Sequence, residues 1–257
     1  DAKIARHYMP NRHALIAHAI ATSEQCFNGF VIILSATIKL MMLSLLRASI
    51  CALFLPLLLN SAPAFPVESA LGLKAIFQQT VDRRLELPED EQQHYAALIQ
   101  NEMQRAGLSA LPPQYLLLVD RSAQVQAVLL FWLSDQGQLE FIGASPASSG
   151  IHNGFEYFET PLGIFDHNIA NQDFRAEGTL NSKGIRGYGR KGMRVYDFGW
   201  VNARQTWRTG TGKMRLQLHA TDPDYLEPRL GTVQSKGCIR IPAALNELID
   251  RYGILDA

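Results

Sequence analysis

The chain carries two kinds of hydrophobic pattern. Between residues 67 and 107, apolar side chains recur every three or four positions in two runs, which predicts two helices. The second run opens at Pro88, which suits the start of a helix, and Gly107 is placed to end it. A further helix is expected over residues 242–252, where a proline and a glycine bracket the same spacing.

After the break at residues 111–113, short apolar runs favour strands. Runs rich in Leu, Val and aromatic residues are separated by turn signals such as Asp-Gln-Gly at 135–137. The expected strands are residues 115–119, 125–133, 139–142, 193–201 and 214–219. The pattern predicts a mostly β fold, an antiparallel β-sandwich or barrel, with a preceding helical segment and a short C-terminal helix.

The most apolar stretch lies near the start of the chain, at residues 30–59. Read from Met41, it has the layout of a secretory signal peptide, with Arg47 as the positive region and Ala-Pro-Ala at 62–64 as the cleavage site. The apolar run 48–59 has 12 residues, whereas a bilayer span needs about 20. We expect cleavage after Ala64 and export to the periplasm or cell envelope, with an uncleaved membrane anchor as the alternative.

The chain is therefore expected to have three parts. Residues 1–64 are expected to be a leader, in which 41–64 is the signal peptide. Residues 1–40 have no obvious role and are expected to be an upstream extension, with a longer positive region of the signal as the alternative. Residues 65–112 form a helical segment, and residues 113–257 form the main domain. Membrane contact is expected only through the leader, if it stays uncleaved.

Composition and charge add two constraints. The chain is 47% hydrophobic and has 24 basic and 24 acidic residues, so it is neither disordered nor drawn to nucleic acid by bulk charge. Residues 175–215, however, carry 10 basic and 2 acidic side chains. A glycine-rich basic run at 182–192 can follow a phosphate backbone. In an exported protein we expect instead a solvated loop or a dock for an anionic wall polymer, and no nucleic acid partner.

Cysteine use points to chemistry. Of three cysteines, only Cys238 lies beyond the leader, although exported proteins usually pair their cysteines or lack them. A single thiol is either an inert buried group or a reactive nucleophile. Fifteen residues separate His219 from the segment Ser-Lys-Gly-Cys-Ile-Arg-Ile at 235–241. An imidazole that folds beside the thiol could take its proton and activate it.

The neighbours of Cys238 supply further parts of an acyl-transfer site. Gly237 lets the backbone approach a substrate and directs N–H groups at a developing oxyanion. Ser235 offers a hydroxyl donor, and Arg240 a guanidinium suited to a carboxylate. The combination indicates acyl transfer through a thioester on Cys238.

Plainer interpretations of these residues stay open. Cys238 could be a small buried hydrophobe, and His219 a structural side chain. A zinc site could combine these two with His152 or His167, although the spacing is not that of the usual zinc motifs.

At these residues the chain resembles the active-site signature of the L,D-transpeptidase catalytic domain, the YkuD-like family. That signature is a His, a gap of this size, and then Ser/Thr-His-Gly-Cys-(Ile/Val)-Arg. Residues 159–165, Glu-Thr-Pro-Leu-Gly-Ile-Phe, resemble the family's Thr-Pro-x-Gly-x-Phe segment, and a strand pair precedes a turn at Gly150. The resemblance covers residues 113–257. One departure is Lys236, which stands where the family has His and keeps a positive charge near the thiolate.

The resemblance implies a role for each matching residue. Cys238 would be the nucleophile, and His219 its base and then the acid for the leaving amine. The carbonyl of Ala220 would orient the imidazole. Backbone N–H groups of Gly237 and Cys238 would form the oxyanion hole, and no metal or organic cofactor would be needed. The residues expected to hold the loop or contact the substrate are Ser235, Lys236 and Arg240.

The implied substrate is a tetrapeptide stem of peptidoglycan. Cys238 would attack the carbonyl of the third residue, and terminal D-alanine would leave. An amine of another stem, or a lysine of a wall-anchored protein, would take the acyl group, as in an L,D-transpeptidase of cell wall biogenesis and cell shape. Two alternatives remain: the same thioester ending in hydrolysis, and a non-catalytic wall-binding module, since a fold does not prove activity.

Overall fold

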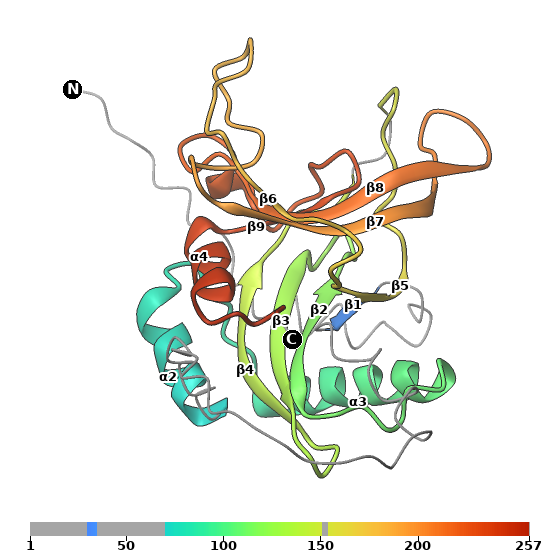
Figure 1. Ribbon diagram of the computed structural model, residues 1–257, viewed down its shortest axis with the longest axis vertical. Helices are drawn as coiled ribbons and strands as arrows, with labels where there is room; N and C mark the ends of the chain where they lie inside the picture. The colour runs from blue at the N-terminus through green and yellow to red at the C-terminus, as the bar shows by residue number, and fades with distance from the viewer. Residues whose placement is uncertain (1–29, 35–69, 151–153, 257) are drawn as a thin grey trace, which may run out of the picture.

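Two β-sheets stack on one another in the computed structural model, which describes residues 30–34, 70–150 and 154–256. The five-stranded sheet has the order β4 (Leu139–Pro146), β3 (Ala127–Leu133), β2 (Gln114–Asp120), β1 (Phe30–Leu34) and β5 (Gly163–Asp166). The four-stranded sheet has the order β6 (Phe174–Arg175), β7 (Arg194–Arg204), β8 (Thr211–Ala220) and β9 (Ile239–Ile241). Figure 1 shows the four-stranded sheet crossing above the other.

The expected helices are confirmed. They are α2 (Ala70–Thr80), α3 (Glu89–Arg105) and α4 (Ala243–Arg251), and a short 3₁₀ helix spans Glu227–Arg229. Pro88 stands at the N-cap of α3, and three acidic residues fill its first turn, where they face the positive end of the helix dipole. Gly107 follows the end of α3 with a φ of 72°, a left-handed value that glycine adopts without strain.

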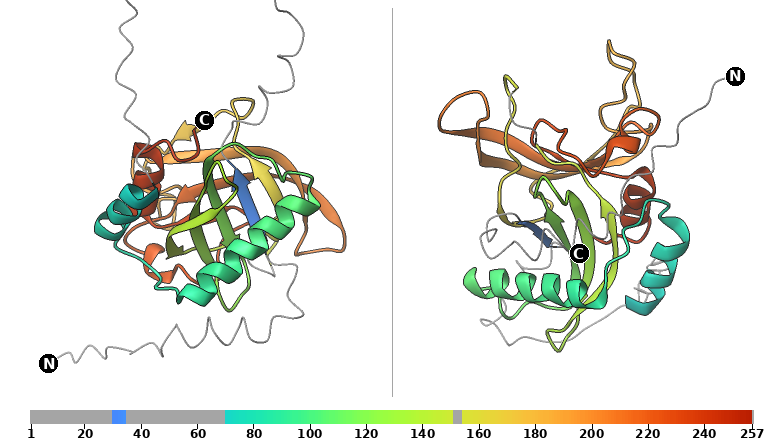
Figure 2. Two further views of the ribbon diagram at one scale, coloured as in Figure 1. Left: turned by 90° about the horizontal axis from the view of Figure 1, so that it is seen from below. Right: turned by 180° about the vertical axis from the view of Figure 1, so that it is seen from behind.

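Helix α3 covers the outer face of the five-stranded sheet (Figure 2). Its buried stripe is Tyr95, Ile99 and Met103, spaced four residues apart. These side chains join a core with alternate residues of the strands, among them Ile32 and Leu116. The predicted helical segment is therefore one wall of the same folded unit as the sheets.

A second core lies between the two sheets. It contains Leu117 from the five-stranded sheet and Leu218 from the four-stranded sheet, and α2 and α4 close one side of it. Phe77 of α2 lies so close to the sheet that a Cβ on Gly143 would come within 2.3 Å of its ring. Glycine at this position of β4 is thus required for α2 to pack.

Strand β1 gives residues 30–34, which fall within the expected leader, a place in the five-stranded sheet. Phe30–Leu34 lies between β2, to which it is antiparallel, and β5, to which it is parallel. Val31 and Ile33 enter the core between the sheets, and Ile32 and Leu34 enter the core under α3. Because both faces of the strand are covered, its sequence is continuously apolar.

The structure confirms a mainly β fold but corrects its description as antiparallel. Both sheets are mixed, because β1 pairs with β5 and β8 pairs with β9 in parallel. The expected turn at Gly150 is a bridge to Ser235, so that the chain after β4 runs beside the loop that carries Cys238. Ser148 makes two backbone hydrogen bonds with Arg240, both 2.9 Å long, which tie the two sheets together.

The predicted signal peptide, residues 41–64, and its cleavage site lie outside the described residues. Among the helices that the structure describes, none has the length and apolar character needed to cross a membrane.

Candidate active site

The candidate site lies on the face of the four-stranded sheet that points away from the core. Along β8, Leu218 points into the core, whereas Gln217 and His219 point to the other face. The parallel register sets His219 opposite Arg240 on β9. Cys238 precedes Arg240 by two positions and shares its side of the sheet. His219 on β8 and Cys238, the residue directly before β9, therefore lie on the same side of the sheet.

Cys238 is a free, half-buried thiol. Its Sγ lies 3.7 Å from the carbonyl oxygen of Arg215. Burial raises the pKa of the Cys238 thiol, and Asp197 raises it too, while the backbone N–H of Gln217 and the charge of Arg240 oppose the rise. The resting group is thus the thiol, and it needs a base to become a nucleophile.

His219 is held in the form that can act as that base. Its Nδ1 lies 2.5 Å from the carbonyl of Ala220, which is the contact expected for this residue. Because a carbonyl only accepts, Nδ1 carries the hydrogen and Nε2 is left to take a proton. Burial lowers the pKa of His219 to about 4, so the ring is neutral at physiological pH.

The described contacts of these two groups run to the backbone. Cys238 contacts Arg215 and His219 contacts Ala220, and a direct Sγ–imidazole hydrogen bond is not among the contacts of the described residues. Diagonal neighbours on adjacent strands lie within reach of long side chains. Proton transfer from a neutral thiol to a neutral imidazole would therefore accompany attack on a substrate rather than precede it.

The loop before Cys238 differs from expectation at Gly237. Its N–H donates to the Ser235 hydroxyl, at 3.0 Å, so it is engaged and does not face an oxyanion as predicted. Gly237 has a φ of 131°, and a Cβ there would lie 2.8 Å from the Cε of Met214. Ser235 is buried and closes this turn. The Cys238 N–H is the other predicted oxyanion donor of the loop.

Thr160 supports the same loop from the segment that resembles the family's Thr-Pro motif. It is fully buried. Its hydroxyl accepts from the Gly150 N–H at 2.9 Å and donates to the Gly237 carbonyl at 2.7 Å. The motif, which sequence analysis treated only as a landmark, thus fixes the backbone beside Cys238.

Two cations flank the thiol in different ways. Lys236 is exposed, and its ammonium lies 5.2 Å from the ring centre of Tyr157. Arg240 donates to the Gln234 carbonyl at 3.3 Å, which holds the loop as expected. The buried Nε of Arg240 has no hydrogen-bond partner among the described residues. Burial lowers the pKa of Arg240, and the neighbouring Cys238 opposes that change.

Sequence analysis missed a polar network behind the site. The fully buried Asp197 accepts from Arg215 Nε at 2.6 Å and from the Gln217 amide at 3.0 Å. Gln217 in turn accepts from the Tyr188 hydroxyl at 3.3 Å, and the Tyr188 ring lies 4.7 Å from the ring of His219. Polar residues at alternate positions 215, 217 and 219 were the signal that could have found it.

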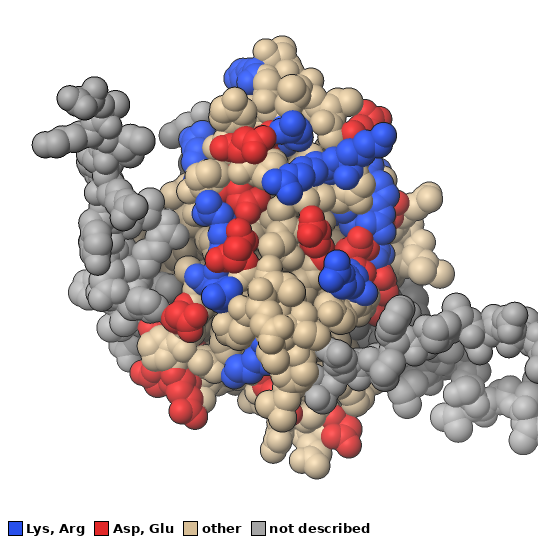
Figure 3. Space-filling model, turned by 90° about the vertical axis from the view of Figure 1, so that its left-hand side faces the viewer, with Lys and Arg blue, Asp and Glu red and all other residues tan. Residues whose placement is uncertain are grey.

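The basic segment does not form an uninterrupted cationic surface. Arg186 pairs with Asp222 and Asp224, and Arg194 pairs with Asp173. Figure 3 shows Lys and Arg interleaved with Asp and Glu over the side of the molecule that faces left in Figure 1. Paired charges of this kind attract a polyanion less than the sequence count implies.

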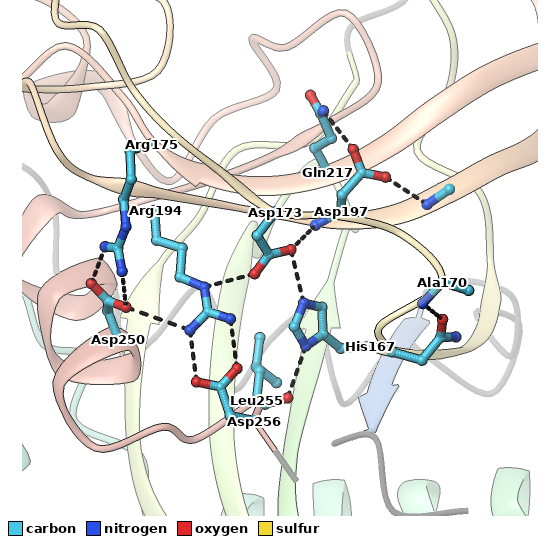
Figure 4. A network of polar contacts seen from close by, with 12 residues as sticks. His167, Ala170, Asp173, Arg175, Arg194, Asp197, Gln217, Asp250, Leu255 and Asp256 are labelled. Atoms are coloured by element: carbon cyan, nitrogen blue, oxygen red, sulfur yellow. Dashed lines mark hydrogen bonds and ion pairs between the residues drawn. The ribbon is translucent and has the colours of Figure 1, made fainter. Parts of the chain in front are cut away.

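His167, considered above as a zinc ligand, belongs to another network (Figure 4). Its Nε2 lies 2.9 Å from Asp173 and its Nδ1 lies 2.8 Å from the Leu255 carbonyl. Both partners are acceptors, so the charged ring satisfies them best. Burial opposes that charge, but the hydrogen bonds to Asp173 and Leu255 raise the pKa of His167 overall. In the described part of the chain, no three His, Cys, Asp or Glu side chains are grouped to hold a metal.

The raised pKa of His167 predicts a pH-dependent contribution to stability. At about pH 5.5, where the ring is charged, the free energy of unfolding of the wild type should exceed that of His167→Gln by about 1–3 kcal/mol. At about pH 8.5 the difference should be smaller. The difference is present below the unfolded pKa and is lost as pH rises through the folded one. Urea unfolding at both pH values measures it. His219→Gln is the contrasting variant, because the lowered pKa of His219 costs the wild type stability as pH falls from about 6.5 towards 4.

No family model matches the chain, and no curated protein matches it.

Proposed function

We propose that this protein is an exported cysteine acyltransferase that acts on peptidoglycan stem peptides, an L,D-transpeptidase. The observation that carries the proposal is the shared sheet face of Cys238 and His219, with the imidazole fixed by the Ala220 carbonyl. The signature around Cys238 and the buried Thr160 support it. The substrate class comes from the resemblance of these segments to the family.

In the first half-reaction, Cys238 Sγ attacks the carbonyl carbon of the third stem residue. The thiol proton moves to His219 Nε2, and the oxygen of the tetrahedral intermediate accepts from the Cys238 N–H. His219 then donates that proton to the amine of D-alanine, the C–N bond breaks, and a thioester remains on Cys238.

In the second half-reaction, an acceptor amine attacks the thioester carbonyl. His219 takes a proton from the attacking amine and returns it to the sulfur as the C–S bond breaks. We assign the guanidinium of Arg240, which also holds the loop through the Gln234 carbonyl, to a substrate carboxylate. The new amide joins the stem to the acceptor, a second stem or a lysine of a wall protein.

Product analysis tests the proposal. The purified protein is incubated with disaccharide-tetrapeptides, and the products are separated and fragmented by mass spectrometry. We expect dimers joined through the third residues, and free D-alanine in equal amount. Release of D-alanine without dimers would replace transfer by hydrolysis. Binding to isolated cell wall with neither product would replace the enzyme by a wall-binding module.

Export is part of the proposal, with the leader either cleaved after Ala64 or kept as an uncleaved anchor, and the two forms differ in β1. Cleavage after Ala64 would cut β1 from the remainder of the chain, so the exported form would lose the strand between β2 and β5. N-terminal sequencing of protein from the cell envelope tests this. A start at Phe65 supports cleavage, whereas a start before Phe30 would contradict it and retain β1.

A further inference from the structure

The sheet face that carries Cys238 continues along the β7–β8 hairpin. The register pairs Trp200 with Arg215 and Asn202 with Lys213, and all four are exposed. Cross-strand partners point to the same side of a sheet. These four residues, here called the hairpin strip, begin beside the nucleophile, because the Arg215 carbonyl lies 3.7 Å from Cys238 Sγ.

Trp200 is the aromatic element of the hairpin strip. Its side chain is 67% exposed, and no other described ring contacts it. The bulge between Asp197 and Trp200 alters the pairing of β7 with β8 just before this residue. An exposed indole on the same sheet face as Cys238 offers a flat apolar surface to a ligand.

The rest of the hairpin strip is cationic and partly fixed in place. Arg215 binds the buried Asp197 through Nε at 2.6 Å, and its side chain is still 46% exposed. The two terminal nitrogens of its guanidinium group can donate to a second carboxylate. Lys213 has no ion-pair partner among the described residues. The hairpin strip thus places the flat Trp200 ring beside two cations. This combination suits a ligand in which an uncharged ring is joined to a carboxylate.

We propose that the hairpin strip binds the sugar unit of an acidic glycopeptide, with a sugar ring on Trp200 and a stem carboxylate on Lys213 and Arg215. The inference rests on the proposed function and extends it, because it assigns recognition of the glycan to residues outside the thiol loop. A single-stranded nucleic acid fits less well, because such ligands use several stacking rings along a continuous basic groove.

Binding measurements on the Cys238→Ala protein test the proposal without turnover. Its affinity for a disaccharide-tetrapeptide is compared with that for the free tetrapeptide. We expect the disaccharide to bind about tenfold more tightly, and Trp200→Ala to remove that advantage. Lys213→Glu should weaken both ligands, since both carry the stem carboxylate. The matched controls are Tyr225→Ala, an aromatic that is 64% exposed, and Lys74→Glu on the exposed side of α2, and both should bind as the parent does.

Several results would overturn the inference. These are equal affinity for the two ligands in the parent, an equal loss of both in Trp200→Ala, or displacement of the disaccharide by a single-stranded oligonucleotide. Failure of the proposed function is seen separately, by mass spectrometry of wild-type protein mixed with free tetrapeptide. Thioester formation without glycan preference defeats the inference alone. Glycan preference without a thioester defeats the proposed enzyme and leaves the strip as a binding site.

Discussion

Replacing Cys238 by alanine is expected to reduce release of D-alanine from a stem tetrapeptide by a factor on the order of 10⁴ or more. The reason is that the proposed reaction passes through a bond to Sγ, and none of the groups around it can replace sulfur in that bond. The measurement is the rate of D-alanine release at saturating tetrapeptide, for wild type and variant purified alike.

Two further variants make this result specific. Tyr225→Ala removes an exposed ring from the loop after β8 and should leave the rate unchanged. His219→Gln keeps Cys238 but removes the base, and should also reduce the rate severely. Because the pKa of His219 is lowered to about 4, the wild-type rate should fall only as the pH approaches that value and the ring takes a proton. Undiminished release by Cys238→Ala would contradict the proposed chemistry.

The variant Ile33→Asp is expected to unfold the full-length chain, or to lower its free energy of unfolding by several kcal/mol. Ile33 is fully buried and lies between Leu117 of β2 and Phe165 of β5. A carboxylate there has neither water nor a counter-charge. Urea unfolding followed by circular dichroism measures the change. The matched control is Ile169→Asp, because Ile169 is 101% exposed and the same substitution there should cost little.

The same experiment decides whether β1 is needed. If Ile33→Asp is as stable as Ile169→Asp, or if a chain of residues 65–257 is as stable as the full chain, then β1 does not hold the sheet together. Residues 30–34 would then belong to the leader and not to the fold. A large loss in both the variant and the shortened chain supports the sheet position of β1.

The elements predicted from sequence are those with a long, regular pattern. Helix α3 shows its stripe over 17 residues and has clear start and stop signals. Strand β8 alternates polar and apolar residues over positions 213–220. Strands β5, β6 and β9 have two to four residues, too few for a period to emerge. Strand β1 was assigned to a leader because a strand buried on both faces is as apolar as a signal sequence.

Only part of the candidate site could be predicted, because the rest depends on how the strands and loops pack. Residue types and spacing singled out Cys238 and His219, and the parallel pairing of β8 with β9 places both on one face. The sequence does not reveal that the Gly237 N–H donates to the Ser235 hydroxyl, because the direction of that N–H depends on the loop conformation. The network from Asp197 to Tyr188 depends on strand register and loop packing, which periodicity does not contain.

Intact-mass spectrometry of the protein mixed with a stem tetrapeptide tests the central claim most directly. We predict a gain in mass equal to the mass of the tetrapeptide minus the mass of free D-alanine, which carries away the thiol hydrogen. Peptide mapping should locate the gain on Cys238, and Cys238→Ala should lack it. An unmodified Cys238 in protein that nevertheless releases D-alanine, or the same adduct on the alanine variant, would contradict it.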